Sequence, residues 1–235
     1  MGEDIRLKSA AGEIGAYLAT PKGTPKGGVV VIQEIFGVNH HIRAVADKFA
    51  ADGYIALAPR FFDHIKPGIE LGYTPDTIAE GRGYVMTPGF TDKAVQDVDA
   101  AMQELKRRGA RKVAVTGYCW GGTIAWLAAT RLKPDAVSAY YGGGIHGTKN
   151  EKATVPTQMH FGDKDMHIPM AHVNELRQLH PDVAIFDYPA DHGFHCDERG
   201  SWDAAASKQA MARTLELFAS TSGDGHGSAP LQWRS

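Results

Sequence analysis

One cysteine of the chain stands where a strand-like run turns into a helix-like run. Residues 113–116 are small or β-branched, and they lead through Gly117 and a tyrosine to Cys119, with Gly121 two residues further on. The order strand, Gly-x-nucleophile-x-Gly, helix is that of a nucleophile elbow, whose glycines permit a sharp turn. The positive end of the helix dipole favours a thiolate at this position. The plainer interpretation is that Cys119 is a small buried hydrophobe, as free cysteines often are.

An elbow of this kind requires an acid after a later strand and a histidine after the last strand. Asp163 and Asp165 follow an apolar run at 157–162. Asp163 adjoins the end of that run and can cap a turn there, whereas Asp165 projects further over the edge of the sheet. We therefore expect Asp165 to be the catalytic acid.

The histidine candidates lie in a short segment after the last apolar run. His192 precedes Gly193, which lets the backbone curve so that the ring reaches the pocket, and we expect His192 to be the catalytic base. His195 is the weaker candidate. A metal site built from His192, His195, Cys196 and Asp197 lacks a second well-spaced pair of ligands, so we expect no metal here.

The segment after the run at 28–33 supplies an oxyanion donor. It reads Glu34, Ile35, Phe36, Gly. The backbone N–H groups of Ile35 and Trp120 are expected to stabilise the charge that develops on a substrate oxygen. Glu34 would place a carboxylate at the mouth of the site, although a solvated charge at a strand end fits the spacing as well. Four aromatic residues are candidates either for an apolar pocket or for plain core: Phe36, Tyr118, Trp120 and Phe194.

Apolar runs of strand length alternate with helix-like segments along the chain. The strand candidates are 28–33, 54–59, 112–117, 136–142, 157–162 and 183–189, and the helix candidates are 41–53, 92–108 with Thr91 as its cap, and 207–220. The strand candidates are continuously apolar rather than alternating, which is typical of strands covered on both faces. We therefore predict an α/β fold, a doubly wound and mostly parallel sheet with helices on both faces.

Residues 1–220 are expected to form one α/β domain. Residues 61–91 are long for a loop and are a candidate flap over the site. Residues 221–235 are rich in Gly and Ser and are expected to be a flexible tail. No internal repeat is evident.

The composition of the chain argues against some classes of binding partner. The 235 residues include 25 basic and 27 acidic side chains without a basic stripe, which argues against nucleic acid as a partner. No apolar run is long enough to cross a membrane, and no secretory signal is visible. With two cysteines the chain has no disulfide framework, so we expect a reducing, cytoplasmic location.

The segments QEIFG, GYCWGG, GDKD and HGF together resemble the dienelactone hydrolase (carboxymethylenebutenolidase) family of α/β-hydrolases, over roughly residues 5–220. The resemblance implies a triad of Cys119, His192 and Asp165 and no metal or organic cofactor. It also implies that Glu34 contacts the thiol in the resting enzyme and helps to convert it to a thiolate. The family's archetypal reaction opens the lactone 4-carboxymethylenebut-2-en-4-olide to maleylacetate, a step in the breakdown of chloroaromatic compounds.

One departure from the family concerns the substrate carboxylate. The family arginine four residues after the catalytic histidine is replaced here by Cys196. Arg199 is the nearest arginine, and Arg82 is a loose match to a second family arginine. We keep both, together with Phe36, as candidates for substrate binding.

Three other functions fit the same residues. A general carboxylesterase or thioesterase would use the same triad on a larger or more apolar small-molecule substrate. A non-catalytic binding protein on this fold would ordinarily have lost a triad member, and this chain has lost none. A redox sensor would need a disulfide between Cys119 and Cys196.

Overall fold

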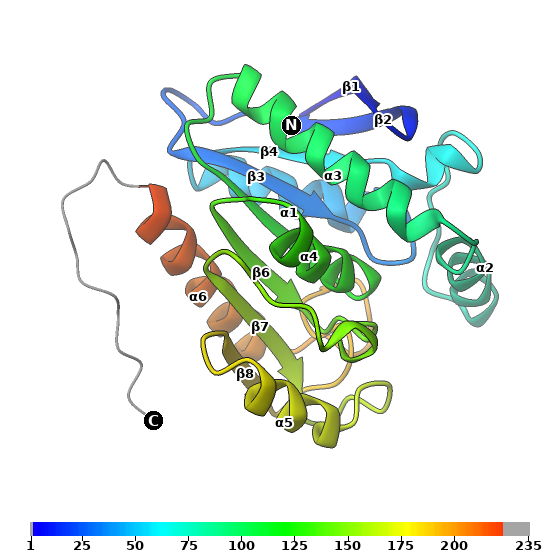
Figure 1. The fold of residues 1–235 in the computed structure, drawn as a ribbon. Coiled ribbons are helices and arrows are strands. Elements are labelled where there is room, and N and C mark those ends of the chain that lie inside the picture. Colours follow the sequence, from blue (N-terminus) through cyan, green and yellow to red (C-terminus); the bar gives the residue numbers. More distant parts are fainter. Residues whose placement is uncertain (1, 223–235) are drawn as a thin grey trace.

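The computed structural model describes residues 2–222, which fold around a sheet of eight strands in the order β1-β2-β4-β3-β5-β6-β7-β8 (Figure 1). The strands are β1 (Glu3–Ser9), β2 (Gly12–Ala19), β3 (Gly27–Ile32), β4 (Tyr54–Pro59), β5 (Val113–Tyr118), β6 (Ala136–Tyr140), β7 (Thr157–Gly162) and β8 (Ala184–Tyr188). Strands β4, β3, β5, β6, β7 and β8 pair in parallel, and β2 pairs antiparallel with both β1 and β4.

Helices cover both faces of this sheet, as the sequence predicts. They are α1 (His40–Ala51), α2 (Pro75–Val85), α3 (Phe90–Arg107), α4 (Trp120–Arg131), α5 (Met170–Leu179) and α6 (Ala204–Ser222), with 3-10 turns at Phe61–His64 and His146–Thr148. Helices α3 and α4 pack on one face, and α1 and α6 pack on the other (Figure 1). On that second face the rings of Phe49 in α1 and Phe218 in α6 lie 6.1 Å apart, centroid to centroid.

Five of the six continuous apolar runs are strands in the interior of the sheet. The sixth, at 183–189, forms the edge strand β8, which is only partly buried, so the prediction that it is covered on both faces is wrong. Every residue of β3, β4, β5, β6 and β7 is buried, because helices exclude water from both faces. All six predicted strands are present, with ends that differ by at most two residues from the prediction. The hairpin of β1 and β2 was not predicted. Its first strand is mostly exposed and polar, so it lacks the continuous apolar run that marks the others.

Two local predictions need correction. Helix α3 begins at Phe90 rather than after Thr91, because Gly89 takes the cap position with a left-handed φ of 76°. The stretch 61–91 is not one open loop: it contains a 3-10 turn and α2, whose N-terminus is capped by the hydroxyl of Thr74. Of the predicted tail at 221–235, the first two residues end α6, and the others lie outside the described residues.

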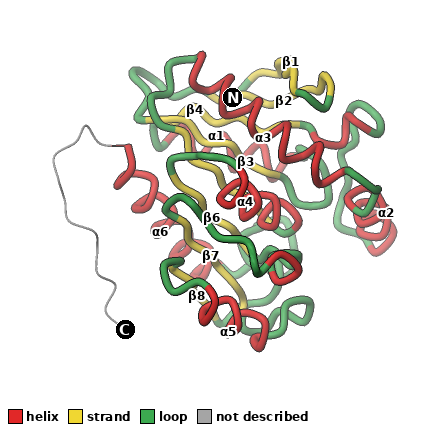
Figure 2. The backbone as a smooth tube through the Cα atoms, in the orientation of Figure 1, coloured by secondary structure: helices red, strands yellow, loops and turns green. Residues whose placement is uncertain are grey.

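The parallel sheet brings several loops to one edge. Because β3, β5, β7 and β8 run in the same direction, the loops that follow them start from the same end of the sheet. Figure 2 shows the strands in yellow and these connecting loops in green. Binding sites of open α/β sheets form at this end of the strands. In the described part of the chain, no helix combines the length and apolarity needed to cross a membrane.

Candidate active site

The predicted elbow is present between β5 and α4. Cys119 occupies the N-cap position of α4 with φ 56° and ψ −121°, a backbone conformation that residues with a Cβ rarely adopt. A Cβ on Gly117 would lie 2.0 Å from the carbonyl oxygen of Gly121, and a Cβ on Gly121 would lie 2.3 Å from the carbonyl oxygen of Gln33. Both glycines are therefore required by the close crossing of the strand and the helix.

His192 contacts the other two residues of the predicted triad. Its Nε2 lies 3.2 Å from the Sγ of Cys119, and its Nδ1 lies 2.6 Å from the Oδ2 of Asp165. Cys119 follows β5, Asp165 follows β7 and His192 follows β8, so the common edge of the parallel strands brings the three side chains together. This is the nucleophile, base and orienting acid geometry of covalent hydrolases.

Of the two candidate aspartates, Asp165 contacts His192, and backbone amides hold its carboxylate. The Oδ1 of Asp165 accepts hydrogen bonds from the N–H of His167 at 2.8 Å and from the N–H of Ile168 at 3.2 Å. These bonds fix the carboxylate and leave Oδ2 for the histidine. Asp163 is exposed to solvent instead.

Of the two candidate histidines, His192 contacts Cys119. Gly193 has a φ of 78°, which turns the chain directly after His192. His195 is buried under the sheet end, where its Nδ1 lies 2.9 Å from the hydroxyl of Ser207 and its ring stacks on Tyr118. Burial lowers the pKa of His195 to about 3, so it stays neutral and serves the core.

The environment of His192 favours its charged form. Burial by itself lowers the pKa of this imidazole, but the sulfur of Cys119 and the carboxylate of Asp165 outweigh burial and raise the pKa to about 10. Near neutral pH the imidazole of His192 is therefore held mostly in its protonated form.

Two backbone N–H groups remain available for the predicted oxyanion hole. Trp120 begins α4, so its N–H belongs to the first turn, which has no partner inside a helix. Ile35 lies in the loop after β3, and within residues 2–222 its N–H donates to no backbone carbonyl. A Cβ on Gly81 would lie 2.0 Å from the carbonyl oxygen of Ile35, so α2 packs directly on this loop.

Glu34 is placed differently from the expectation. Its Oε1 forms an ion pair at 3.0 Å with Nη1 of Arg199, and the side chain of Glu34 is 2% exposed. The thiol of Cys119 contacts His192 instead, so the expected contact of Glu34 with the thiol is replaced in this structure. The guanidinium of Arg199, which pairs with this carboxylate, lies over the ring of Phe36 at 5.5 Å from its centroid.

The candidate substrate-binding residues fall in three different environments. Phe36 is 1% exposed and packs edge-on against Tyr73, so it supports the site from behind and is not a surface of it. Arg199 is largely buried against Glu34. Arg82 is exposed on α2. Of the aromatic pocket candidates, Tyr118 and Phe194 are wholly buried core, and Trp120 is partly exposed.

Two tyrosines at the site were not predicted as site residues. Tyr141 follows β6 with a φ of 36°, and its ring lies 5.2 Å from that of His192. The hydroxyl of Tyr73 contacts the Sγ of Cys196 at 3.4 Å. Tyr141 could have been suspected, because it directly follows β6, the strand beside β5. Tyr73 lies in the 61–91 segment, which the sequence marks as a candidate flap without indicating which of its side chains reaches the site. Both Cys119 and Cys196 are free thiols.

The order of the strands and the place of the elbow between β5 and α4 are those of an α/β-hydrolase. The sequence model of the dienelactone hydrolase family matches residues 14–222. The chain therefore belongs to the dienelactone hydrolase family and is a hydrolase.

Individual relatives agree with this assignment. A Synechocystis sp. (strain PCC 6803) protein provisionally named a carboxymethylenebutenolidase is 36% identical over 225 residues, covering 88% of this chain and 91% of the relative. Carboxymethylenebutenolidase 1 of Cupriavidus pinatubonensis is 30% identical, covering 93% of this chain and 96% of the relative. A crystal structure from Klebsiella pneumoniae, provisionally described as a dienelactone hydrolase, superposes with a TM-score of 0.80 at 30% identity, covering 93% of this chain and 98% of that one.

Proposed function

We propose that the chain hydrolyses lactone or ester bonds through Cys119, His192 and Asp165, with a thioester intermediate. The observation that carries the proposal is the position of His192, whose two ring nitrogens contact the Sγ of Cys119 and the Oδ2 of Asp165. A nucleophile, a base and an orienting acid in this contact are the minimum for acyl transfer to a side chain.

In the first half of the reaction the thiolate of Cys119 attacks the carbonyl carbon. The carbon–oxygen double bond becomes an oxyanion, which accepts hydrogen bonds from the N–H groups of Ile35 and Trp120. Collapse of the oxyanion breaks the bond to the leaving oxygen, and the imidazolium of His192 donates a proton to that oxygen. Each oxyanion donor is expected to contribute about 10²–10³ in rate.

In the second half, water hydrolyses the thioester. His192, now neutral, accepts a proton from the water as its oxygen attacks the acyl carbon, and Cys119 leaves as a thiolate. Asp165 holds the imidazole in one orientation and stabilises its positive form in both halves. An enolate or alkoxide leaving group is a better fit to a thiol nucleophile than an amine.

The family's archetypal lactone, opened to maleylacetate, is the first substrate that we propose. The names of the Synechocystis and Cupriavidus relatives support it. That lactone carries a free carboxylate, which needs a cation. In this chain Arg199 is paired with Glu34, so a substrate carboxylate would have to compete with Glu34 for the guanidinium.

A general carboxylesterase or thioesterase is the second candidate. It is favoured by two observations at the site, the replacement of the family arginine by Cys196 and the exposed position of Arg82 on α2. A neutral ester needs the triad and the oxyanion donors but no free guanidinium.

A paired assay separates the two candidates. The purified protein is given the dienelactone or a short p-nitrophenyl ester, before and after treatment with iodoacetamide. Alkylation will report on Cys119, because Cys196 is buried and burial raises the pKa of its thiol to about 12.

We expect lactone turnover that alkylation abolishes. Alkylation-sensitive turnover of the ester alone would keep the mechanism and move the substrate to neutral esters. Turnover that survives complete alkylation of Cys119 would contradict the proposed nucleophile.

A further inference from the structure

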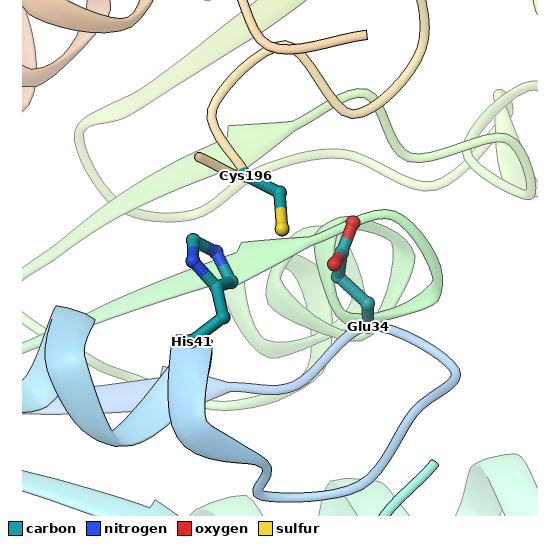
Figure 3. Close-up of side chains that lie close together, drawn as sticks. All are labelled: Glu34, His41 and Cys196. Carbon is teal, nitrogen blue, oxygen red and sulfur yellow. The ribbon is translucent and has the colours of Figure 1, made fainter. Parts of the chain in front are cut away.

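A second cluster of reactive side chains lies outside the proposed triad. Glu34, His41 and Cys196 place a carboxylate oxygen, a ring nitrogen and a sulfur within 4.8 Å of one another. These residues come from the loop after β3, the start of α1 and the loop that follows His192. Figure 3 shows the sulfur of Cys196 between the His41 ring and the Glu34 carboxylate, with one ring nitrogen of His41 facing it. All three residues are at most 2% exposed.

Two of the potential ligand atoms in this cluster have no hydrogen-bond partner within the described residues. Within residues 2–222, neither the Oε2 of Glu34 nor the Nε2 of His41 has a hydrogen-bond partner, although both are buried. A buried polar atom without a partner is costly, and a native structure ordinarily explains each one by a water or an ion. Here the two residues that carry these atoms each place a ligand atom within 4.8 Å of the sulfur of Cys196, which itself contacts the hydroxyl of Tyr73.

The other nitrogen of His41 is already oriented. Its Nδ1 lies 3.2 Å from the Oδ1 of Asp197, a contact in which the ring N–H donates to the carboxylate. A proton on Nδ1 leaves the lone pair of Nε2 free on the side of the cluster. A carboxylate behind the ligating histidine is a recurring feature of metal sites, where it fixes the tautomer and the ring orientation.

We propose that Glu34, His41 and Cys196 bind one divalent cation of the zinc class. Carboxylate oxygen, imidazole nitrogen and thiolate sulfur are all zinc ligands, and three of them leave the fourth tetrahedral position for water. Ligands bonded at about 2.0–2.3 Å lie roughly 3.5 Å apart around a tetrahedral ion, so the donors need to close by about 1 Å. On binding, a metal–sulfur bond replaces a metal–water bond, and the thiol proton passes to solvent.

The charged groups in direct contact with the cluster balance with a dication. Arg199 contributes one positive charge next to Oε1 of Glu34, and the ion contributes two. Glu34, Asp197 and the thiolate of Cys196 supply three negative charges in return. Arg199 occupies Oε1 and leaves Oε2 for the ion, so the two cations do not compete for the same oxygen.

The proposed ion connects α1 and the loop after β3 to the loop that carries His192. It would stabilise the backbone on which the base sits, without touching Cys119. The proposal replaces the expectation that the protein holds no metal. It does not depend on the proposed hydrolysis, because metal binding is measured without a substrate.

The first experiment uses cobalt(II) chloride as a spectroscopic probe for zinc. The full chain is freed of metal with a chelator and titrated with Co²⁺, and the near-ultraviolet charge-transfer band of a cobalt–thiolate bond is recorded. The triad also contains a thiol and an imidazole, so the matched variants are Cys119→Ala and Cys196→Ala. We expect one Co²⁺ per chain, a band that persists in Cys119→Ala and a band that is lost in Cys196→Ala.

The opposite pattern would overturn the proposal. A band that persists in Cys196→Ala and disappears in Cys119→Ala would place the ion on the triad. Absence of a band in the wild-type protein, together with no rise of its Tm on addition of zinc chloride, would mean that water fills the cluster.

A surface variant tests the site without a substitution in the core. The side chain of Asp197 is 49% exposed, so Asp197→Asn is expected to fold, and loss of its charge behind His41 should weaken Zn²⁺ binding about 10-fold or more. Asp182→Asn, an exposed carboxylate in the loop before β8, makes the same charge change away from the cluster. Equal Zn²⁺ affinity of the two variants, measured by competition with a chromophoric chelator, would contradict the assigned ligands.

Discussion

The Nε2 of His192 lies 3.2 Å from the Sγ of Cys119, across 73 residues of sequence. The two residues lie in separate segments, one after β5 and the other after β8. They meet because β5 and β8 run parallel in one sheet and both chains leave the sheet at the same edge. The contact makes the thiol a candidate nucleophile, and the first prediction tests that contact directly.

Substitution of Cys119 is expected to remove hydrolysis and to keep the fold. Cys119→Ala should lower kcat by about 10⁴-fold or more, since triad members act as a unit. Cys119→Ser should retain a weak activity, because a hydroxyl ionises poorly where a thiolate is favoured. Steady-state kinetics and circular dichroism of both variants check the prediction, and full activity of Cys119→Ala would refute the assignment.

The elbow conformation predicts a stability difference between two inactive variants. Cys119 has a φ of 56°, a region that glycine enters without steric cost. Cys119→Gly should therefore be more stable than Cys119→Ala by about 1 kcal/mol, in spite of glycine's greater freedom in the unfolded chain. Urea denaturation of the two proteins gives the comparison, and a less stable glycine variant would show that the turn is not strained.

The imidazole of His192 is expected to titrate at high pH. Its pKa of about 10 lies above the value of roughly 6.5 for an unfolded chain. Its protonated form therefore stabilises the fold fully below pH 6.5, and that stabilisation is lost as the pH rises through about 10. Heteronuclear NMR of the ring should follow this titration. In Asp165→Asn the midpoint should fall, because the charged hydrogen-bond partner is gone; an unchanged midpoint would argue against a role of Asp165.

Two glycines of α2 allow a matched pair of alanine substitutions. A Cβ on Gly81 would lie 2.0 Å from the carbonyl oxygen of Ile35, whereas a Cβ on Gly83 would meet nothing within 4 Å. Gly81→Ala should displace the oxyanion loop, lower kcat/KM about 10-fold or more and cost about 1–3 kcal/mol of stability. Gly83→Ala should keep full activity and gain up to about 1 kcal/mol from helix propensity. Similar kinetics for both would show that α2 does not position Ile35.

The ion pair of Glu34 and Arg199 predicts an asymmetry between single and double variants. Glu34 is 2% exposed and Arg199 is 18% exposed, so Arg199→Met leaves a buried carboxylate without its partner. We expect a loss of about 3 kcal/mol. The double variant Glu34→Gln with Arg199→Met should recover most of that loss, since no unpaired charge remains. The free energies of unfolding are measured by chemical denaturation. If the loss in the double variant equals the sum of the losses in the two single variants, the two side chains do not interact.

His160 in β7 predicts sensitivity to acid. It is wholly buried between the hydroxyls of Ser138 and Tyr188, and burial holds its pKa well below the ordinary value. An unfolded chain takes up a proton here below pH 6.5 and the native chain does not. The stabilisation is therefore complete above pH 6.5 and is lost as the pH falls, by at most about 1.4 kcal/mol per pH unit.

The control for this acid sensitivity is the variant His160→Gln. It keeps a polar side chain in the core but has no proton to take up. Unfolding free energies at pH 8 and pH 5 should fall less steeply in the variant than in the wild-type protein. Equal pH dependence would assign the acid sensitivity to other groups.

The elements and the order of the catalytic residues could be predicted from the sequence because their signals are local. A continuous apolar run between turn residues marks a strand, which is why all six predicted strands are present. Five of them are buried inside the sheet, whereas β8 lies at its edge and is only partly buried. The elbow is also local, since the glycines on either side of Cys119 are demanded by the turn itself. The hairpin β1–β2 escaped prediction because β1 is mostly exposed and polar and so has no such run.

The pairing of side chains was decided by tertiary structure. Asp165 rather than Asp163 faces His192 because two backbone amides of the next turn hold its carboxylate. Arg199 meets Glu34, across 165 residues, because of the path of the loop after His192, which no short motif encodes. Local patterns report on backbone conformation, whereas partners separated by a hundred residues depend on strand register and loop paths. The sequence by itself therefore determined the fold and the nucleophile's position, and the tertiary structure decided what each charged group contacts.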